Sequence, residues 1–164
     1  MREPILTFAA RSEWYGLAAQ EVREVARVGS VRPVPRAPGL VAGLAEVHGR
    51  IVTLIDLDRL IPADGARHPA GAPAAGSGIG PFGIVLAPPL DHLGILVRSE
   101  VDVAAWPEET ATPPESGRGV WLRARLPVGE RLLNLIALPE LVERLEQAIR
   151  AGFVPGGGTA GGEA

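Results

Sequence analysis

Short apolar segments, separated by polar or turn-forming residues, dominate the hydrophobic pattern of this chain. Six segments are rich in Val, Ile and Leu, and they lie at residues 5–10, 51–55, 84–87, 93–97, 120–124 and 131–136. Gly, Pro or Asp residues separate them at intervals that are typical of a β-barrel or sandwich, and less typical of alternating strands and helices. The pattern therefore predicts a mainly β fold.

One segment near the C-terminus, residues 138–152, has helical periodicity instead. Pro139 suits the first helical position and Gly152 suits the C-terminal cap. Five apolar side chains fall on one face of the predicted helix: Leu138, Leu141, Val142, Leu145 and Ile149. We expect this face to pack onto the sheet, since an amphipathic helix on a small β domain usually covers core. Docking of a partner on the same face is the alternative.

Several other segments are ambiguous or lack a packing pattern. Residues 18–29 fit either a helix or a turn that leads into a strand, whereas prolines at 33, 35 and 38 predict an extended connector. Residues 62–81 and 107–119 are rich in small and polar side chains, so we expect two mobile loops there. The Gly-rich residues 153–164 are expected to form a flexible tail.

Composition limits both the compartment and the partners. The chain has 164 residues and is 46% hydrophobic, which is enough for one domain with a real core or two small lobes that share one. Its 16 basic and 19 acidic residues give a formal charge of −3, so we predict no nucleic-acid partner. Cysteine is absent, and no apolar run approaches the roughly 18 residues of a membrane span. We therefore expect a cytoplasmic protein without membrane insertion.

Patterns for catalysis or metal binding are not found in the sequence. The three histidines, His48, His68 and His92, do not have metal-ligand spacing, and no serine lies in a G-x-S-x-G elbow. A G-x-G-x-x-G match at residues 78–83 follows a predicted loop and precedes a strand. A dinucleotide site needs a strand before that loop and a helix after it. We predict that the protein is not an enzyme and holds no metal or cofactor.

Four motifs follow one another in a specific order. Residues 6–25 read LTFAARSEWYGLAAQEVREV, and residues 33–61 read PVPRAPGLVAGLAEVHGRIVTLIDLDRLI. Further along, residues 92–103 read HLGILVRSEVDV and residues 131–142 read RLLNLIALPELV. Together these motifs resemble the CheW-like family of bacterial chemotaxis adaptors, over roughly residues 4–150.

The resemblance implies a fold and a mode of action. It implies a single CheW-like domain over residues 1–152, made of two small five-stranded SH3-like barrels that share an apolar interface, with a C-terminal α-helix. It also implies an adaptor that acts through contacts alone. One barrel would bind the regulatory domain of a CheA-type histidine kinase, and a groove between the barrels would bind the cytoplasmic tip of a chemoreceptor.

Positions that match the family motifs carry over as candidate site residues. Val22, Glu24, Gly43 and His48 correspond to partner-binding positions. The alternatives are ordinary core for Val22, solvated surface for Glu24 and a turn histidine without a partner for His48. Gly43 is also expected to bracket a tight connection between strands, where a side chain would obstruct the backbone.

A second set of matching positions implies structural turns: Tyr15, Gly16, Pro38, Gly49 and Asp56. Gly49 is expected at the other end of the connection that Gly43 begins. Asp56 is expected to end a strand and to accept hydrogen bonds from nearby backbone N–H groups.

The chain departs from the family pattern at several positions. His48 replaces an arginine, so a permanently charged guanidinium gives way to an imidazole, which ordinarily titrates near pH 6.5. Arg98 and Ala137 stand where acids are common, and Thr53 stands where proline is frequent. These departures indicate a divergent member. A stand-alone regulator that binds a kinase or pathway partner without receptors is therefore an alternative to the adaptor. A small-molecule-binding barrel is another, although an aromatic content of 4% disfavours it.

Overall fold

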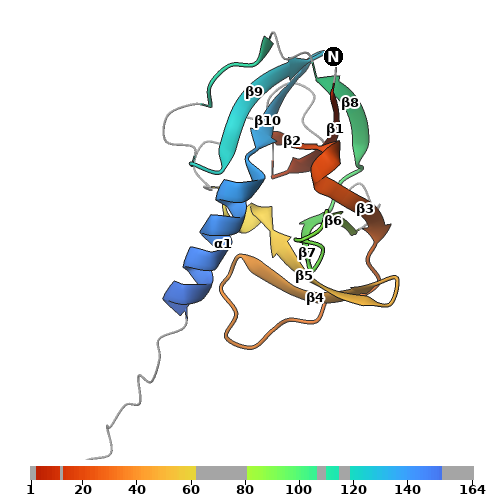
Figure 1. Cartoon of the computed structure of the whole chain (residues 1–164), viewed down its shortest axis with the longest axis vertical. Coiled ribbons are helices and arrows are strands. Elements are labelled where there is room, and N and C mark those ends of the chain that lie inside the picture. Colours follow the sequence, from red (N-terminus) through yellow and green to blue (C-terminus); the bar gives the residue numbers. More distant parts are fainter. Residues whose placement is uncertain (1–2, 12, 62–80, 107–109, 115–118, 153–164) are drawn as a thin grey trace, which may run out of the picture.

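The computed structural model describes the chain except for residues 1–2, 12, 62–80, 107–109, 115–118 and 153–164 (Figure 1). The described residues form two five-stranded sheets with a C-terminal helix, which confirms the predicted mainly β fold. The elements in chain order are β1 (Glu3–Ala10), β2 (Glu13–Ala18), the 3-10 turn η1 (Ala19–Glu21), β3 (Val22–Arg27), β4 (Val41–Val47), β5 (Arg50–Asp56), the 3-10 turn η2 (Leu57–Arg59), β6 (Phe82–Leu86), β7 (Leu93–Val97), β8 (Asp102–Trp106), β9 (Leu122–Val128), β10 (Arg131–Ile136) and α1 (Leu138–Gly152). The predicted mobile loop at 62–81 except for residue 81, much of the one at 107–119 and the predicted tail lie outside the described residues.

The strands are divided between two sheets. Sheet A has the strand order β8-β1-β2-β10-β9, and sheet B has the order β3-β6-β7-β5-β4. Neighbouring strands are antiparallel except for two parallel pairs, β2 with β10 and β5 with β7. Figure 1 shows sheet A above sheet B, with the chain descending from β2 into β3.

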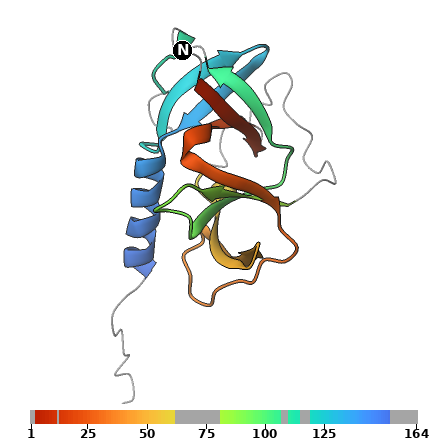
Figure 2. The ribbon, with the colours of Figure 1, turned by 45° about the vertical axis from the view of Figure 1, so that its right-hand side comes forward.

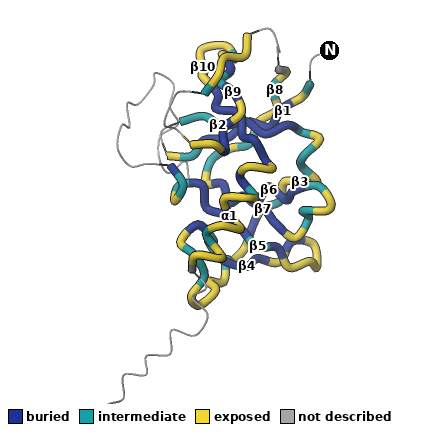
Figure 3. Tube along the Cα trace, turned by 60° about the vertical axis from the view of Figure 1, so that its left-hand side comes forward, coloured by how far each residue is buried: buried dark blue, intermediate teal, exposed yellow. Residues whose placement is uncertain are grey.

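Alternation of side chains along the strands creates three apolar clusters. One face of sheet B encloses Val28, Ala45, Val47, Val52, Leu54, Val85 and Leu96. One face of sheet A encloses Ile5, Ala124, Leu126, Leu133 and Leu135. The other faces of both sheets contribute to a larger shared cluster that includes Phe8, Tyr15, Leu17, Ile55, Ile84 and Ile95. Figure 3 shows these buried strand segments in dark blue, and the shared cluster confirms the predicted apolar interface.

The open edges of each sheet are linked by a short bridge. The chain after β3 exchanges two backbone hydrogen bonds with β4, between Arg32 and Leu44, at 2.8 Å each. The chain after β8 does the same with β9, between Thr112 and Arg125, at 2.9 and 2.8 Å. Within the described residues no continuous ladder joins β3 to β4 or β8 to β9, so complete closure into barrels stays a prediction.

Helix α1 begins and ends at the residues that its periodicity predicted, and it runs beside both sheets (Figure 2). Leu138, Leu141 and Leu145 are buried in the shared cluster, and Val142 is partly buried against it. Ile149, the last residue of the predicted face, is 47% exposed. The helix therefore covers core along its N-terminal part, and its C-terminal part extends past the covered surface.

Four strands were not among the six that the hydrophobic pattern predicted: β2, β3, β4 and β8. The ambiguous residues 18–29 contain η1 and β3 rather than a helix. The predicted connector is extended and turn-like until residue 40, and β4 then begins at Val41.

Candidate functional site

A β-bulge in β3 determines where two of the candidate residues point. Val22 pairs with Leu86 and Glu24 pairs with Val85, so Arg23 is an extra residue without a partner in β6. In a regular strand Val22 and Glu24 would share a face, but the bulge places them on opposite faces. Val22 is partly buried against the shared cluster, whereas the Glu24 side chain is on the other face and 28% exposed.

The β4–β5 hairpin carries another candidate at its tip. Val47 pairs with Arg50, so His48 and Gly49 form a two-residue turn with φ angles of 47° and 79°. Two positive φ angles are typical of a type I′ turn, whose twist matches that of the flanking strands. Gly adopts this conformation freely, whereas a residue with a Cβ such as His48 is strained by about 1 kcal/mol or more. The turn presents the imidazole to solvent, and its side chain is 72% exposed.

Gly43 lies inside β4 rather than at the hairpin tip, and it is buried. Its φ is +149°, and a Cβ built on it would lie 2.3 Å from the Arg32 carbonyl oxygen. Only glycine therefore allows the bridge between Arg32 and Leu44 to approach β4 this closely. The Arg32 backbone therefore packs directly against Gly43 of β4.

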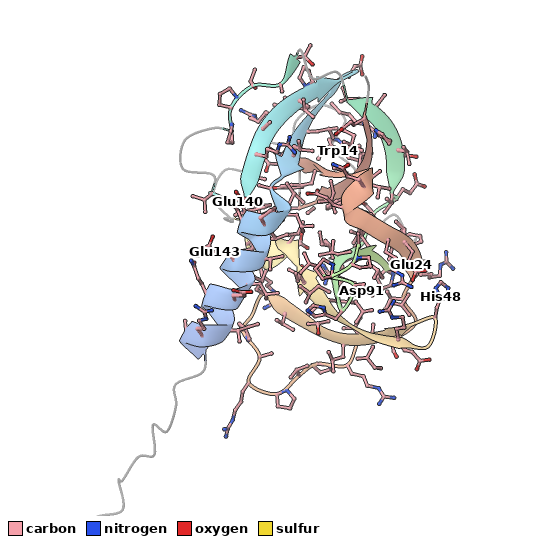
Figure 4. The ribbon with its side chains drawn as sticks, viewed as in Figure 1. Trp14, Glu24, His48, Asp91, Glu140 and Glu143 are labelled. Carbon is pink, nitrogen blue, oxygen red and sulfur yellow. The ribbon has the colours of Figure 1, made fainter. Side chains whose placement is uncertain are left out.

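The structure brings Glu24 and His48 together. His48 Nδ1 lies 2.7 Å from Glu24 Oε2, so the protonated nitrogen donates a hydrogen bond to the carboxylate, and the contact is an ion pair when the imidazole is charged. Figure 4 shows both side chains on the outer edge of sheet B, close to Asp91.

Asp91, in the loop between β6 and β7, completes this group. Its Oδ2 accepts a hydrogen bond from Arg23 at 3.0 Å and another from Arg50. The hydrogen bond from Arg50 lowers the pKa of Asp91, and the charges of Arg50 and Arg23 act in the same direction. We call Arg23, Glu24, His48, Arg50 and Asp91 the rim cluster. No local motif marks Arg23, Arg50 and Asp91, because Asp91 is 68 residues from Arg23 and 41 residues from Arg50 in the sequence.

A second charged group surrounds Asp56 at the end of β5. Asp56 is 6% exposed, and its carboxylate accepts hydrogen bonds from the Asp58 backbone N–H at 3.1 Å and from Arg98 at 3.2 and 3.3 Å. The hydrogen bond to Asp56 raises the pKa of Arg98. Arg98, which departs from the family pattern, thus neutralises the buried Asp56 carboxylate. The two residues meet because β5 and β7 are parallel, so that their C-terminal ends lie side by side.

This second group also links the two sheets. Arg11, in the β1–β2 turn, donates from its backbone N–H to the Asp58 carboxylate at 3.1 Å and from its guanidinium to the Asp58 carbonyl at 2.9 Å. The Ala9 N–H donates to Ser99 Oγ at 2.9 Å. Sheet A and sheet B are therefore joined by polar contacts as well as by the shared apolar cluster.

The remaining candidate positions differ in their placement. Tyr15 and Gly16, expected at a turn, instead lie within β2, and the Tyr15 ring stacks between those of Phe8 and Trp121. Pro38 begins a turn, because its carbonyl accepts a hydrogen bond from the Val41 N–H at 2.9 Å. In the described parts of the chain, no group of three His, Asp or Glu residues could hold a metal ion. The described helices include none that is long and apolar enough to cross a bilayer.

Comparison with known proteins identifies the family. The CheW-like domain model matches residues 4–146. The chemotaxis protein CheW of Treponema pallidum (strain Nichols) is 27% identical over 117 residues, which cover 71% of this chain and 66% of that protein, slightly less than two thirds. The crystal structure of the scaffolding protein TtCheW from Thermoanaerobacter tengcongensis has the same fold, with a TM-score of 0.68 and 21% identity over 84% of this chain and 86% of that one. The chain therefore belongs to the CheW-like domain family.

Proposed function

We propose that this protein is a non-enzymatic adaptor of a chemotaxis-type pathway, which couples chemoreceptors to a CheA-type histidine kinase through protein–protein contacts. The observation that carries the proposal is the CheW-like match across residues 4–146, which span both sheets. The relatives named as a chemotaxis protein and as a scaffolding protein support the same class of function.

Exposed apolar side chains at corresponding places in the two sheets support binding to a kinase domain. Val25 and Val103 lie in the edge strands β3 and β8, and they are 38% and 69% exposed. Ile51 and Leu132 are each the second residue after a two-residue hairpin turn, and they are 63% and 41% exposed. A reversible signalling contact of modest area would depend on a few such apolar anchors.

The rim cluster is the proposed contact for a receptor tip. Glu24 and His48 offer an acid and an imidazole from two different elements on one exposed edge. Val22 faces the shared cluster on the opposite side of β3, so its contribution would be to packing.

Calorimetric titration with a CheA-type regulatory domain and with a receptor hairpin fragment tests the proposal. We expect both to bind. If sheet B makes the contact, Ile51→Asp should weaken kinase binding by about tenfold. If sheet A makes it, Leu132→Asp should have that effect instead. Val120→Asp is the matched control, since Val120 is 80% exposed and lies before β9. Failure of both partners to bind would contradict the adaptor function.

Receptor binding should also depend on pH between about 5.5 and 7.5, because an imidazole ordinarily changes charge in that range. The charged groups around His48 in the rim cluster are Glu24, Arg23, Arg50 and Asp91. His48→Arg should remove the pH dependence by making the positive charge permanent. An affinity of the unmodified protein that stays constant over this range would count against the rim as the receptor contact.

The replacement of arginine by His48 favours one second candidate, a stand-alone regulator of a kinase pathway. An imidazole cannot reproduce a bidentate guanidinium contact. Binding of the kinase domain without any binding of the receptor tip, in the same titrations, would select this candidate.

A further inference from the structure

The function proposed above assigns the direct receptor contact to Glu24 and His48, and the Asp91 carboxylate contacts two of the elements that carry them. We propose that Asp91 is a positioning residue, which holds the β4–β5 hairpin against β3 so that Glu24 and His48 face a partner together. Its consequence for receptor binding rests on the proposed function, whereas the contacts themselves do not.

Three separate elements meet at one carboxylate oxygen. Asp91 Oδ2, from the β6–β7 loop, accepts from Arg23 of β3 at 3.0 Å and from Arg50 of β5. Arg23 directly precedes Glu24, and Arg50 is two residues after His48. Each guanidinium is therefore anchored beside one member of the Glu24–His48 pair, and moving the hairpin away from β3 would break at least one of the two contacts.

The Asp91 contacts join groups that stay charged throughout the neutral range. The hydrogen bond from Arg50 lowers the pKa of Asp91, so its carboxylate is ionised throughout the neutral range, and arginine does not lose its proton there. An imidazole ordinarily becomes neutral above about pH 6.5, and a neutral hydrogen bond is weaker than a charged one.

This difference connects Asp91 to the departure at residue 48. A permanently charged side chain at that position could hold Glu24 at any neutral pH, whereas an imidazole carries no permanent charge. The Arg23–Asp91–Arg50 contacts supply a permanent link between the same two elements. Asp91 thus compensates for the missing guanidinium, and this compensation gives a test that separates positioning from general stability.

The test is a rescue experiment with the full chain and the receptor hairpin fragment. Asp91→Asn removes the charge with little change in size, and we expect the Kd at pH 7.5 to rise about fivefold, the size of two exposed ion pairs. Adding His48→Arg to Asp91→Asn should recover most of the lost affinity, because the new guanidinium pairs permanently with Glu24. Glu130→Gln is the control, since Glu130 is at the tip of the β9–β10 hairpin and forms no ion pair within the described residues.

Two results would overturn the positioning role. One is an unchanged Kd in Asp91→Asn, and the other is an equal loss whether residue 48 is His or Arg. Amide hydrogen exchange without any partner separates this inference from the proposed function: Asp91→Asn should speed exchange in the β4–β5 hairpin by about threefold or more, and Glu130→Gln should not. If the hairpin responds but no partner binds the unmodified protein, the adaptor function fails, and Asp91 still holds the hairpin against β3. If partners bind but neither exchange nor affinity responds to Asp91→Asn, the positioning role of Asp91 fails.

Discussion

Sheet A and sheet B use the same arrangement of five strands, but the chain enters them at different points. In sheet B, the five strands β3 to β7 are consecutive along the chain. In sheet A, β1 and β2 come first and β8, β9 and β10 come after the whole of sheet B. In both, two hairpins are joined by one parallel pair, and the first strand of the order lies beside the first strand of one hairpin (β8 beside β1, β3 beside β6). Sheet A therefore depends on contacts between distant parts of the chain, with sheet B inserted between them.

The correspondence extends to individual positions. Gly16 of β2 pairs with Leu135 of β10, and Gly94 of β7 pairs with Leu54 of β5. In both sheets the leucine side chain lies over the glycine. A Cβ on Gly16 would be 3.6 Å from Leu135, and a Cβ on Gly94 would be 3.0 Å from Leu54. In each sheet the pairing of the same leucine is followed by a bulge, where β9 or β4 contains one extra residue.

The two sheets differ in how the hairpin arginine is held. Arg50 and Arg131 each begin a strand directly after a two-residue turn. Arg50 binds the Asp91 carboxylate, whereas the Arg131 guanidinium lies over the Trp14 ring at 3.9 Å from its centroid. A cation–π contact and an ion pair can anchor the same hairpin position, but the ion pair also reaches the edge strand through Arg23. For that reason we expect the hairpin end of sheet B to have a more fixed shape than the hairpin end of sheet A.

The largest expected difference between the sheets concerns their closing bridges. Gly43 of β4 corresponds to Ala124 of β9, which already carries a Cβ. Gly43→Ala would place a Cβ 2.3 Å from the Arg32 carbonyl oxygen at a φ of +149°, so the bridge to Leu44 must break. We expect a loss of about 3 kcal/mol in the free energy of unfolding, measured by urea denaturation.

Ala124→Gly is the matched control for this change. It removes a buried methyl group and adds backbone freedom, and we expect it to cost about 1 kcal/mol. If Gly43→Ala cost no more than Ala124→Gly, the close bridge would not be a requirement of sheet B, and the two edges would be equivalent.

A smaller difference is expected at the paired glycines. A Cβ at Gly94 would lie within 3.1 Å of Leu54, Val52 and the Ile84 carbonyl, whereas the nearest atom to a Cβ at Gly16 is 3.6 Å away. Gly94→Ala should therefore cost about 1–2 kcal/mol through overpacking. Gly16→Ala should change stability by less than about 0.5 kcal/mol, because ordinary contact and a less flexible unfolded chain offset any strain. Thermal unfolding of both variants checks the order, and equal losses would show that the interior of sheet A is packed as tightly as that of sheet B.

Regular periodicity explains which elements could be predicted from the sequence. Strands β7 and β10 and helix α1 match their predicted ranges, because their apolar residues repeat without interruption. Strands β3 and β4 each contain a bulge, at Arg23 and at Ala42, which shifts the alternation by one residue and hides the strand. Strand β8 consists largely of small or exposed residues, so its pattern is weak.

The candidate site was only partly predictable for a related reason. Glu24 and His48 were selected by motif, and the structure places them 2.7 Å apart. Their relation to Asp91 depends on the β6–β7 loop lying between β3 and the β4–β5 hairpin, which follows from the strand order. The bulge at Arg23 separates Val22 from Glu24, and no feature of the local sequence marks it.

The smallest expected difference concerns the chain just after the corresponding strands β2 and β7. After β7, Arg98 meets the buried Asp56 carboxylate, but the position that corresponds to Asp56 in sheet A is Ala137. After β2 the chain instead carries Glu21. Burial raises the pKa of Glu21 above its ordinary value of 4.5, the charge of Arg123 and a hydrogen bond from the Ala18 backbone partly oppose this, and the nearby Glu140 of α1 adds to it.

Glu21→Gln should therefore stabilise the protein at neutral pH. An acid whose folded pKa is raised costs stability when ionised, so the cost is complete above the folded pKa and absent below the ordinary value of 4.5. We expect a gain of about 0.5 kcal/mol or less at pH 7, because this half-exposed group is screened by solvent, and the gain should vanish as the pH falls below 4.5. Urea denaturation at several pH values measures it, with Glu143→Gln on the exposed face of α1 as the control. A loss of stability at pH 7 would mean that the attraction between Glu21 and Arg123 outweighs the cost of burying Glu21. The chain after β2 would then be stabilised by opposite charges, as the chain after β7 is.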